Sequence, residues 1–188
     1  MMGAVTASPM MAVLMTCVVA WHVPPPRASQ ESGPPIKVGD EAPPLFLTTQ
    51  TGRSVHISVS GRPRVLYVIS PGCGWCARNT ANITVLAKAR GDEYSFIGIS
   101  LKREGLAEFL KESPQPFEVY VATDRSIKEY GLGTMPSTIV TSKAGVVVKK
   151  WNGAFNNSLK AVEDYFNVKM PGVTPPKAPL SAVVGGIS

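Results

Sequence analysis

Apolar residues in the middle of the chain fall into short runs with two different periodicities. Residues 64–70, RVLYVIS, are almost wholly apolar, which is typical of a strand buried on both faces. Pro71 and Gly72 interrupt the run, and from 73 to 89 the apolar residues recur at helical spacing. The pattern therefore predicts a buried strand followed, after a tight turn, by a helix.

Strands and helices alternate through the rest of this central region. Two β-rich runs flank the turn residues Gln50 to Arg53 and predict an N-terminal β-hairpin. The remaining pattern predicts strands at 94–100 and 117–122, helices at 105–112 and 124–130 with Asp124 as the N-cap, a second hairpin at 137–141 and 146–151, and a closing helix at 158–166. This order of elements favours the α/β class, with a mixed central β-sheet flanked by helices and an N-terminal β-hairpin extension.

The ends of the chain differ from this region in composition. Residues 1–23 contain no charged side chain, and their most apolar part has the length of a signal-peptide core, so we interpret them as an export signal or a membrane anchor. No Lys or Arg precedes that part, as it would in most signals. Residues 24–35 form a Pro/Ser-rich linker, 36–169 the folded domain, and 170–188 a tail that we expect to be disordered. The expected location is therefore exported, periplasmic or extracytoplasmic, with the N-terminal segment tethering the protein to the membrane.

Composition limits the classes of partner. Hydrophobic residues make up 44% of the chain and charged residues 17%, as in a single soluble domain with low-charge ends. The net charge of +6 would suit an anionic partner, but the basic residues are scattered without interleaved aromatic residues. We therefore expect no nucleic-acid binding.

Candidate chemistry is concentrated in residues 70–79, SPGCGWCARN. The chain has 3 cysteines, too few for a disulfide-rich scaffold or a zinc site of four thiolates. Cys17 lies in the apolar leader, so Cys73 and Cys76 act as a pair. No further metal ligands flank the pair, so we expect no metal and no organic cofactor.

The predicted helix start favours a redox role for the pair. Cys73 would lie at the helix N-terminus, where free N–H groups and the helix dipole favour a thiolate. Cys76 follows almost one turn later on the same face, close enough to form a disulfide with Cys73. A structural bridge of this spacing would restrain little chain. The residues thus favour thiol–disulfide exchange, with a structural disulfide and a metal site as alternatives. Trp75, between the two cysteines, would form part of an apolar docking patch.

Three segments carry a resemblance to the thioredoxin superfamily. They are CGWC after an apolar strand, MPST at 135–138, and the hairpin STIVTSKAGVVVKKW. The opening VGDEAPPLFLTTQTGRSVHI, with the extra helix and strand before MPST, is similar to the TlpA/ResA branch, known also as redoxin or AhpC/TSA-like domains. The resemblance covers about residues 36–168. It implies a thioredoxin-like fold, Cys73 as nucleophile, Cys76 as resolving thiol, Pro136 as a cis-proline facing the pair, and Met135 in contact with substrate.

The resemblance also implies an activity, with several departures from the family pattern. The expected function is an exported thiol–disulfide oxidoreductase that exchanges disulfides with protein thiols and disulfides and is served by an upstream redox partner. Gly72 stands where the family usually has Trp, and the Pro common before the second cysteine is missing. Tyr67 replaces the buried acid of thioredoxins, so proton removal from Cys76 would rely on water or another group. The alternatives are a non-catalytic thioredoxin-like binding module and a thiol peroxidase, although the Pro and Thr of peroxidase sites are not matched in VLYVISPGC.

Overall fold

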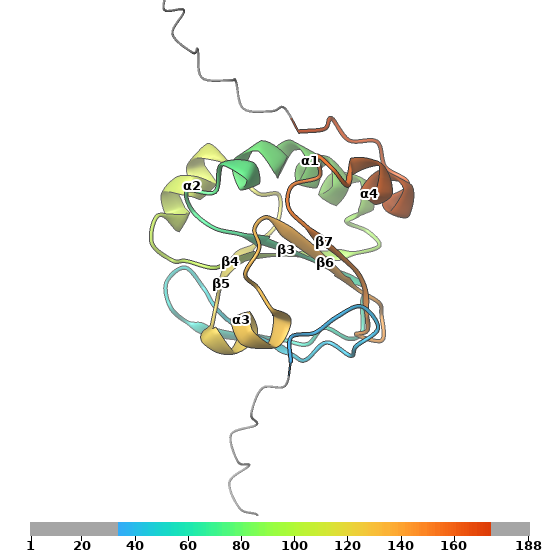
Figure 1. Ribbon diagram of the computed structural model, residues 1–188. Helices are drawn as coiled ribbons and strands as arrows, with labels where there is room; N and C mark the ends of the chain where they lie inside the picture. The colour runs from blue at the N-terminus through green and yellow to red at the C-terminus, as the bar shows by residue number, and fades with distance from the viewer. Residues whose placement is uncertain (1–33, 174–188) are drawn as a thin grey trace, which may run out of the picture. The chain divides into compact units, whose positions relative to one another are not determined.

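A computed structural model describes residues 34–173 of the chain (Figure 1). The predicted leader at 1–23, with Cys17, lies outside the described residues, as do most of the 24–35 linker and residues 174–188 of the tail. Across 34–173, none of the helices has the length and apolar character needed to cross a membrane.

One mixed sheet organises the described residues. Its strands, in chain order, are β1 (Leu45–Thr48), β2 (Ser54–Ile57), β3 (Arg64–Ile69), β4 (Ser95–Ser100), β5 (Val119–Ala122), β6 (Ser137–Thr141) and β7 (Val147–Asn152). They lie side by side in the order β2-β1-β5-β4-β3-β6-β7. The β3–β4 and β4–β5 pairs are parallel and the others antiparallel. Strand β3 is therefore an interior strand, between β4 and β6, and the predicted N-terminal hairpin joins the sheet through β1.

Helices cover both faces of this sheet (Figure 1). Their bounds are α1 (Gly74–Arg90), α2 (Leu106–Glu112), α3 (Asp124–Tyr130) and α4 (Leu159–Phe166). α1, α2 and α4 pack on one face and α3 on the other, so two separate apolar clusters form. The sheet with helices on both faces confirms the predicted α/β architecture.

Strand β3 supplies both clusters, which explains its unbroken run of apolar residues. Val65, Tyr67 and Ile69 point into the cluster under α1, while Leu66 and Val68 point to the opposite face. All five are fully buried. Successive strand residues face opposite sides of a sheet, and here both sides are covered, as the sequence predicts.

The N-cap of α3 differs from the prediction. Asp124 is the first helical residue, and the cap is Thr123, which has an extended backbone. The Thr123 hydroxyl accepts a hydrogen bond from the N–H of Ser126 at 3.4 Å. The same hydroxyl donates to the carbonyl of Phe46 in β1 at 2.6 Å. Thr and Asp are both good N-cap residues. A sequence pattern does not reveal the hydrogen bond from Thr123 to the neighbouring strand.

The packed chain continues past the expected boundary at residue 169. Met170 is buried in the cluster under α1, and its N–H donates to the Glu163 carboxylate in α4 at 2.9 Å. The N–H of Gly172 donates to Oδ1 of Asn82 in α1, also at 2.9 Å. These contacts attach residues 170–172 to two helices.

Candidate active site

The cysteine pair lies where β3 is connected to α1. Strand β3 ends at Ile69, and the N–H of Cys73 donates to the carbonyl of Ser70 at 3.2 Å, which closes the intervening turn. Gly72 adopts φ +76° in this turn, in the left-handed region that other residues enter only at a cost. This conformation accounts for a glycine at the position where the resemblance predicts Trp.

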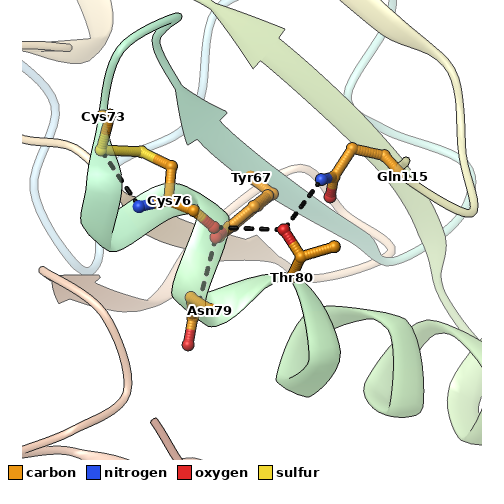
Figure 2. Close-up of a disulfide and its surroundings, with 6 residues drawn as sticks. All are labelled: Tyr67, Cys73, Cys76, Asn79, Thr80 and Gln115. Carbon is orange, nitrogen blue, oxygen red and sulfur yellow. Dashed lines mark hydrogen bonds between the residues drawn. A yellow bond between two sulfur atoms is a disulfide. The ribbon is translucent and has the colours of Figure 1, made fainter. Parts of the chain in front are cut away.

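Cys73 and Cys76 form a disulfide, with their Cα atoms 5.2 Å apart (Figure 2). Cys73 is partly exposed, whereas Cys76 is fully buried in the apolar cluster beneath α1. A partner approaching from solvent therefore reaches the sulfur of Cys73 first. The asymmetry in burial favours the order implied by the resemblance, in which Cys73 attacks and Cys76 resolves, and these two roles stay predictions.

The sulfur of Cys73 acts as the N-cap acceptor of α1. The backbone N–H of Cys76 donates to Sγ of Cys73 at 3.1 Å (Figure 2). The first turn of α1 contains no acidic residue, so no negative charge within that turn opposes the helix dipole. Because the N–H and the dipole both favour negative charge at this point, they stabilise a Cys73 thiolate once the disulfide is reduced.

Trp75 and Arg78 form an aromatic–cation pair beside the disulfide. The indole of Trp75 is 38% exposed, and the guanidinium carbon of Arg78 lies 4.3 Å from the centroid of the ring. An exposed aromatic at this position fits the predicted docking patch, and binding by Trp75 stays a prediction.

Met135 and Pro136 lie at the same edge of the sheet as the cysteine pair. Val68 of β3 pairs with Ser137, the first residue of β6, so Pro136 lies beside the end of β3, from which the turn leads to Cys73. The Met135–Pro136 peptide bond is cis, as the resemblance implies. The Met135 side chain packs against the same cluster as Cys76. The contact of both residues with substrate stays a prediction.

A buried polar network lies beneath the pair. Asn79 donates from Nδ2 to the hydroxyl of Tyr67 at 3.1 Å, and its Oδ1 accepts from Nδ2 of Asn82 at 3.0 Å and from the N–H of Phe155 at 3.2 Å. Burial raises the pKa of the Tyr67 phenol well above its usual value, and the hydrogen bond from Asn79 only partly offsets this. Tyr67 is therefore neutral and takes no part as a base at physiological pH.

A second chain of hydrogen bonds links the pair to the loop before β5. Thr80 donates to the carbonyl of Cys76 at 3.2 Å and accepts from Nε2 of Gln115 at 3.3 Å (Figure 2). Thr80, Gln115 and Asn79 were not predicted from the sequence as residues of the site. A signal was available for Asn79, because an Asn on the apolar face of a predicted helix requires a buried polar partner.

Within residues 34–173 there is no group of three or more His, Cys, Asp or Glu side chains placed to hold a metal ion.

Comparisons with known proteins agree with this geometry. No family model matches the sequence. The methylamine utilization protein MauD of Methylobacillus flagellatus is 28% identical over 145 residues, which cover 76% of this chain and 68% of MauD.

Solved structures give the fold class. The thioredoxin domain of a thiol-disulfide oxidoreductase from Bacteroides vulgatus has a TM-score of 0.58 and 20% identity, covering 70% of this chain and 99% of that domain. A thiol:disulfide interchange protein from Bacteroides sp. has a TM-score of 0.57 and 21% identity, covering 70% of this chain and 91% of that protein. A secreted Mycobacterium tuberculosis disulfide oxidoreductase has a TM-score of 0.50 and 20% identity, covering 57% of this chain and 82% of the oxidoreductase.

The described residues therefore form a thioredoxin-like fold, which confirms the resemblance seen in the sequence. More particularly, the Bacteroides vulgatus neighbour is described as a thiol-disulfide oxidoreductase and the Bacteroides sp. neighbour as a thiol:disulfide interchange protein. This chain has a disulfide between two cysteines with the CXXC spacing.

Proposed function

We propose that the protein is a thiol–disulfide oxidoreductase that exchanges disulfides with protein partners through Cys73 and Cys76. The observation that carries the proposal is the placement of the two sulfurs. Cys73 is partly exposed and its Sγ accepts the N–H of Cys76 at the start of α1, while the disulfide-bonded Cys76 is fully buried.

The reaction needs no other redox group. In the reducing direction the Cys73 thiolate attacks one sulfur of a partner disulfide, forms a mixed disulfide and releases the other partner sulfur as a thiolate. Cys76, after losing its proton, attacks Sγ of Cys73, so that the Cys73–Cys76 bond forms and the second partner thiol leaves. Two electrons pass to the partner, and two protons follow them. The reverse sequence oxidises a partner dithiol.

Substrate positioning is assigned to Trp75, Met135 and Pro136. Across residues 34–173 the backbone of Met135 has no hydrogen-bond partner, whereas the carbonyl of Pro136 accepts from the N–H of Gly153 at 2.7 Å. A partner segment in extended form would pair with the backbone of Met135 as an added strand. The exposed ring of Trp75 would contact the same segment.

Export is part of the proposal. It rests on the apolar, uncharged residues 1–23 and on the description of the Mycobacterium tuberculosis neighbour as secreted. An upstream protein that restores the redox state of the pair would act in the same compartment, with the N-terminal segment holding the domain at the membrane. Fractionation of cells that express the full chain, with and without residues 1–23, tests the location.

Trapping tests the enzymatic proposal. A Cys76→Ala variant should accumulate mixed disulfides with its partners, since the resolving thiol is missing, and a Cys73→Ser variant should accumulate none. The redox state of the trapped partners' cysteines in cells lacking the protein then gives the direction of electron flow. Retained biological function in Cys73→Ser would favour the non-catalytic module, and rapid peroxide consumption would favour a peroxidase.

A further inference from the structure

A cavity of about 350 Å³ is lined by Cys73 and its neighbours in the turn before α1. One wall is formed by the turn that carries Cys73, continued by Ala77 in the first turns of α1, and the opposite wall is formed by α2. Its volume lies at the lower end of the range for small-molecule pockets, roughly 300–1,000 Å³. It therefore has room for a long side chain, but not for a folded segment.

Close contact at one end fixes the two walls relative to each other. Gly105, which precedes α2, has φ +74°, and a Cβ added there would lie 3.4 Å from Cβ of Pro71. The start of α2 thus packs directly on the turn before Cys73. The helix then presents Glu108 and Glu112 to the cavity, one turn apart, with the largely buried ring of Phe109 between them.

The two carboxylates have no partner among residues 34–173. Neither Glu108 nor Glu112 takes part in an ion pair or a side-chain hydrogen bond there, and both are exposed. Glu112 is the last residue of α2, where the helix dipole disfavours a negative charge. Arg78 does not line the cavity. The side chains that line the cavity therefore include two acidic residues and no basic one, in a chain whose net charge is +6.

We propose that this cavity binds the side chain of a Lys or Arg that lies next to the reactive cysteine of the partner polypeptide. The inference rests on the proposed exchange function and specifies its substrate. Glu108 and Glu112 would pair with the ammonium or guanidinium group, and Phe109, Pro71 and Ala77 would contact the methylene stem. A partner cysteine flanked by acidic residues would place like charges together and bind less well.

The occupant follows from charge and from distance. Cys73 is itself one of the lining residues, so a side chain in the cavity belongs to a residue within a few positions of the attacked sulfur. A small hydrated cation would leave the apolar lining residues Pro71, Ala77 and Phe109 without a contact. A long amphipathic side chain is the better ligand, because it can contact both these apolar residues and the two carboxylates. Long-range steering by a net charge of +6 would favour acidic partners. Binding in the cavity would favour basic partners, so the two effects predict opposite preferences for the charge of the partner.

Single-turnover exchange with short peptides tests the inference. The full-length protein is first reduced and freed of reductant, then mixed with a peptide whose only cysteine is capped by 2-mercaptoethanol and flanked by Lys, Gln or Glu. Each turnover oxidises the Cys73–Cys76 pair and releases the peptide thiol and 2-mercaptoethanol. The neutral reagent 2-hydroxyethyl disulfide gives a reference rate for each variant.

Wild type should react about three- to tenfold faster with the Lys peptide than with the Glu peptide at low salt, from two partly exposed ion pairs. The ratio should fall close to one in Glu108→Gln/Glu112→Gln and reverse in Glu108→Lys. Glu104→Gln, an exposed acid that does not line the cavity, should keep the wild-type ratio and reference rate. Equal peptide rates in wild type, or a preference that survives in the double variant, would overturn this inference alone. A lack of exchange even with the neutral reagent would overturn the proposed function, and this inference with it.

Discussion

The side-chain amide of Asn79 donates a hydrogen bond of 3.1 Å to the hydroxyl of Tyr67 in the core beneath the cysteine pair (Figure 2). The thioredoxin resemblance places a buried acid at position 67, and this chain has a buried phenol instead. Because burial raises the pKa of Tyr67, the position is occupied by a permanently neutral group whose role is to satisfy Asn79.

Removal of the Tyr67 hydroxyl should destabilise the oxidised protein without changing its fold. In Tyr67→Phe the buried Nδ2 group of Asn79 loses its acceptor, and an unsatisfied buried donor costs about 1–3 kcal/mol. Urea unfolding should show this loss in the free energy of unfolding. Tyr120→Phe is the matched control, because the Tyr120 hydroxyl bonds to Glu118 at the surface, and its effect should stay within about 0.5 kcal/mol. Equal losses in both variants would contradict a buried network.

Tyr67 should also make the protein less stable at alkaline pH. Its pKa is raised in the folded state, so above the unfolded value of about 10 the unfolded chain releases a proton that the folded chain retains. This contribution is fully present below pH 10 and is lost as pH rises further. The free energy of unfolding should fall about 1.4 kcal/mol per pH unit more steeply in wild type than in Tyr67→Phe. Parallel slopes above pH 10 would show that Tyr67 ionises in the folded state.

A neutral Tyr67 predicts an unchanged pH dependence of exchange. If the phenol accepted the proton of Cys76, Tyr67→Phe would shift the pH–rate profile. Because burial raises the pKa of Tyr67 above its usual value, the pH–rate profile for exchange with 2-hydroxyethyl disulfide should have the same midpoint in Tyr67→Phe as in wild type, even where the variant's rate changes. A displaced midpoint would instead assign Tyr67 a direct role in proton transfer.

The sequence was informative wherever one residue or one local pattern determined the structure. The apolar run of β3, the start of α1 at the cysteine pair and the order of elements depend on local periodicity, and all are as predicted. The cis bond before Pro136 followed from the resemblance.

Contacts between distant segments were not predictable in this way. Asn79 in α1 accepts a hydrogen bond from Phe155, and Thr80 in the same helix accepts one from Gln115, and both donors are distant in the sequence. Glu108 and Glu112 come to lie beside Cys73 only because Gly105 packs on Pro71. A periodic pattern in the sequence carries no information about such contacts. The N-cap of α3 was predicted one residue too late for the same reason, because the hydrogen bond of Thr123 to β1 joins distant segments.

The turn before Cys73 should tolerate no side chain without cost. Gly72 has φ +76° with nothing within 4 Å of an added Cβ, so Gly72→Ala introduces backbone strain without a steric clash. We expect a loss of about 1–2 kcal/mol in the free energy of unfolding. Gly133→Ala is the control, because Gly133 has equally open surroundings and no left-handed φ. A stability for Gly72→Ala equal to that of Gly133→Ala would mean that the turn relaxes to another conformation.

Asn79 should be the most sensitive position of the polar network, because it serves three partners at once. In Asn79→Ala the N–H of Phe155 and the side chain of Asn82 lose an acceptor, and the Tyr67 hydroxyl loses a donor. With each buried unsatisfied group costing about 1–3 kcal/mol, the total loss should exceed that of Tyr67→Phe in the same urea titration. Asn156→Ala provides the control, since Asn156 is exposed and bonds only to its neighbour Asn157. A smaller loss in Asn79→Ala than in Tyr67→Phe would mean that water replaces the amide, and the site beneath Cys76 would then be wet instead of closed.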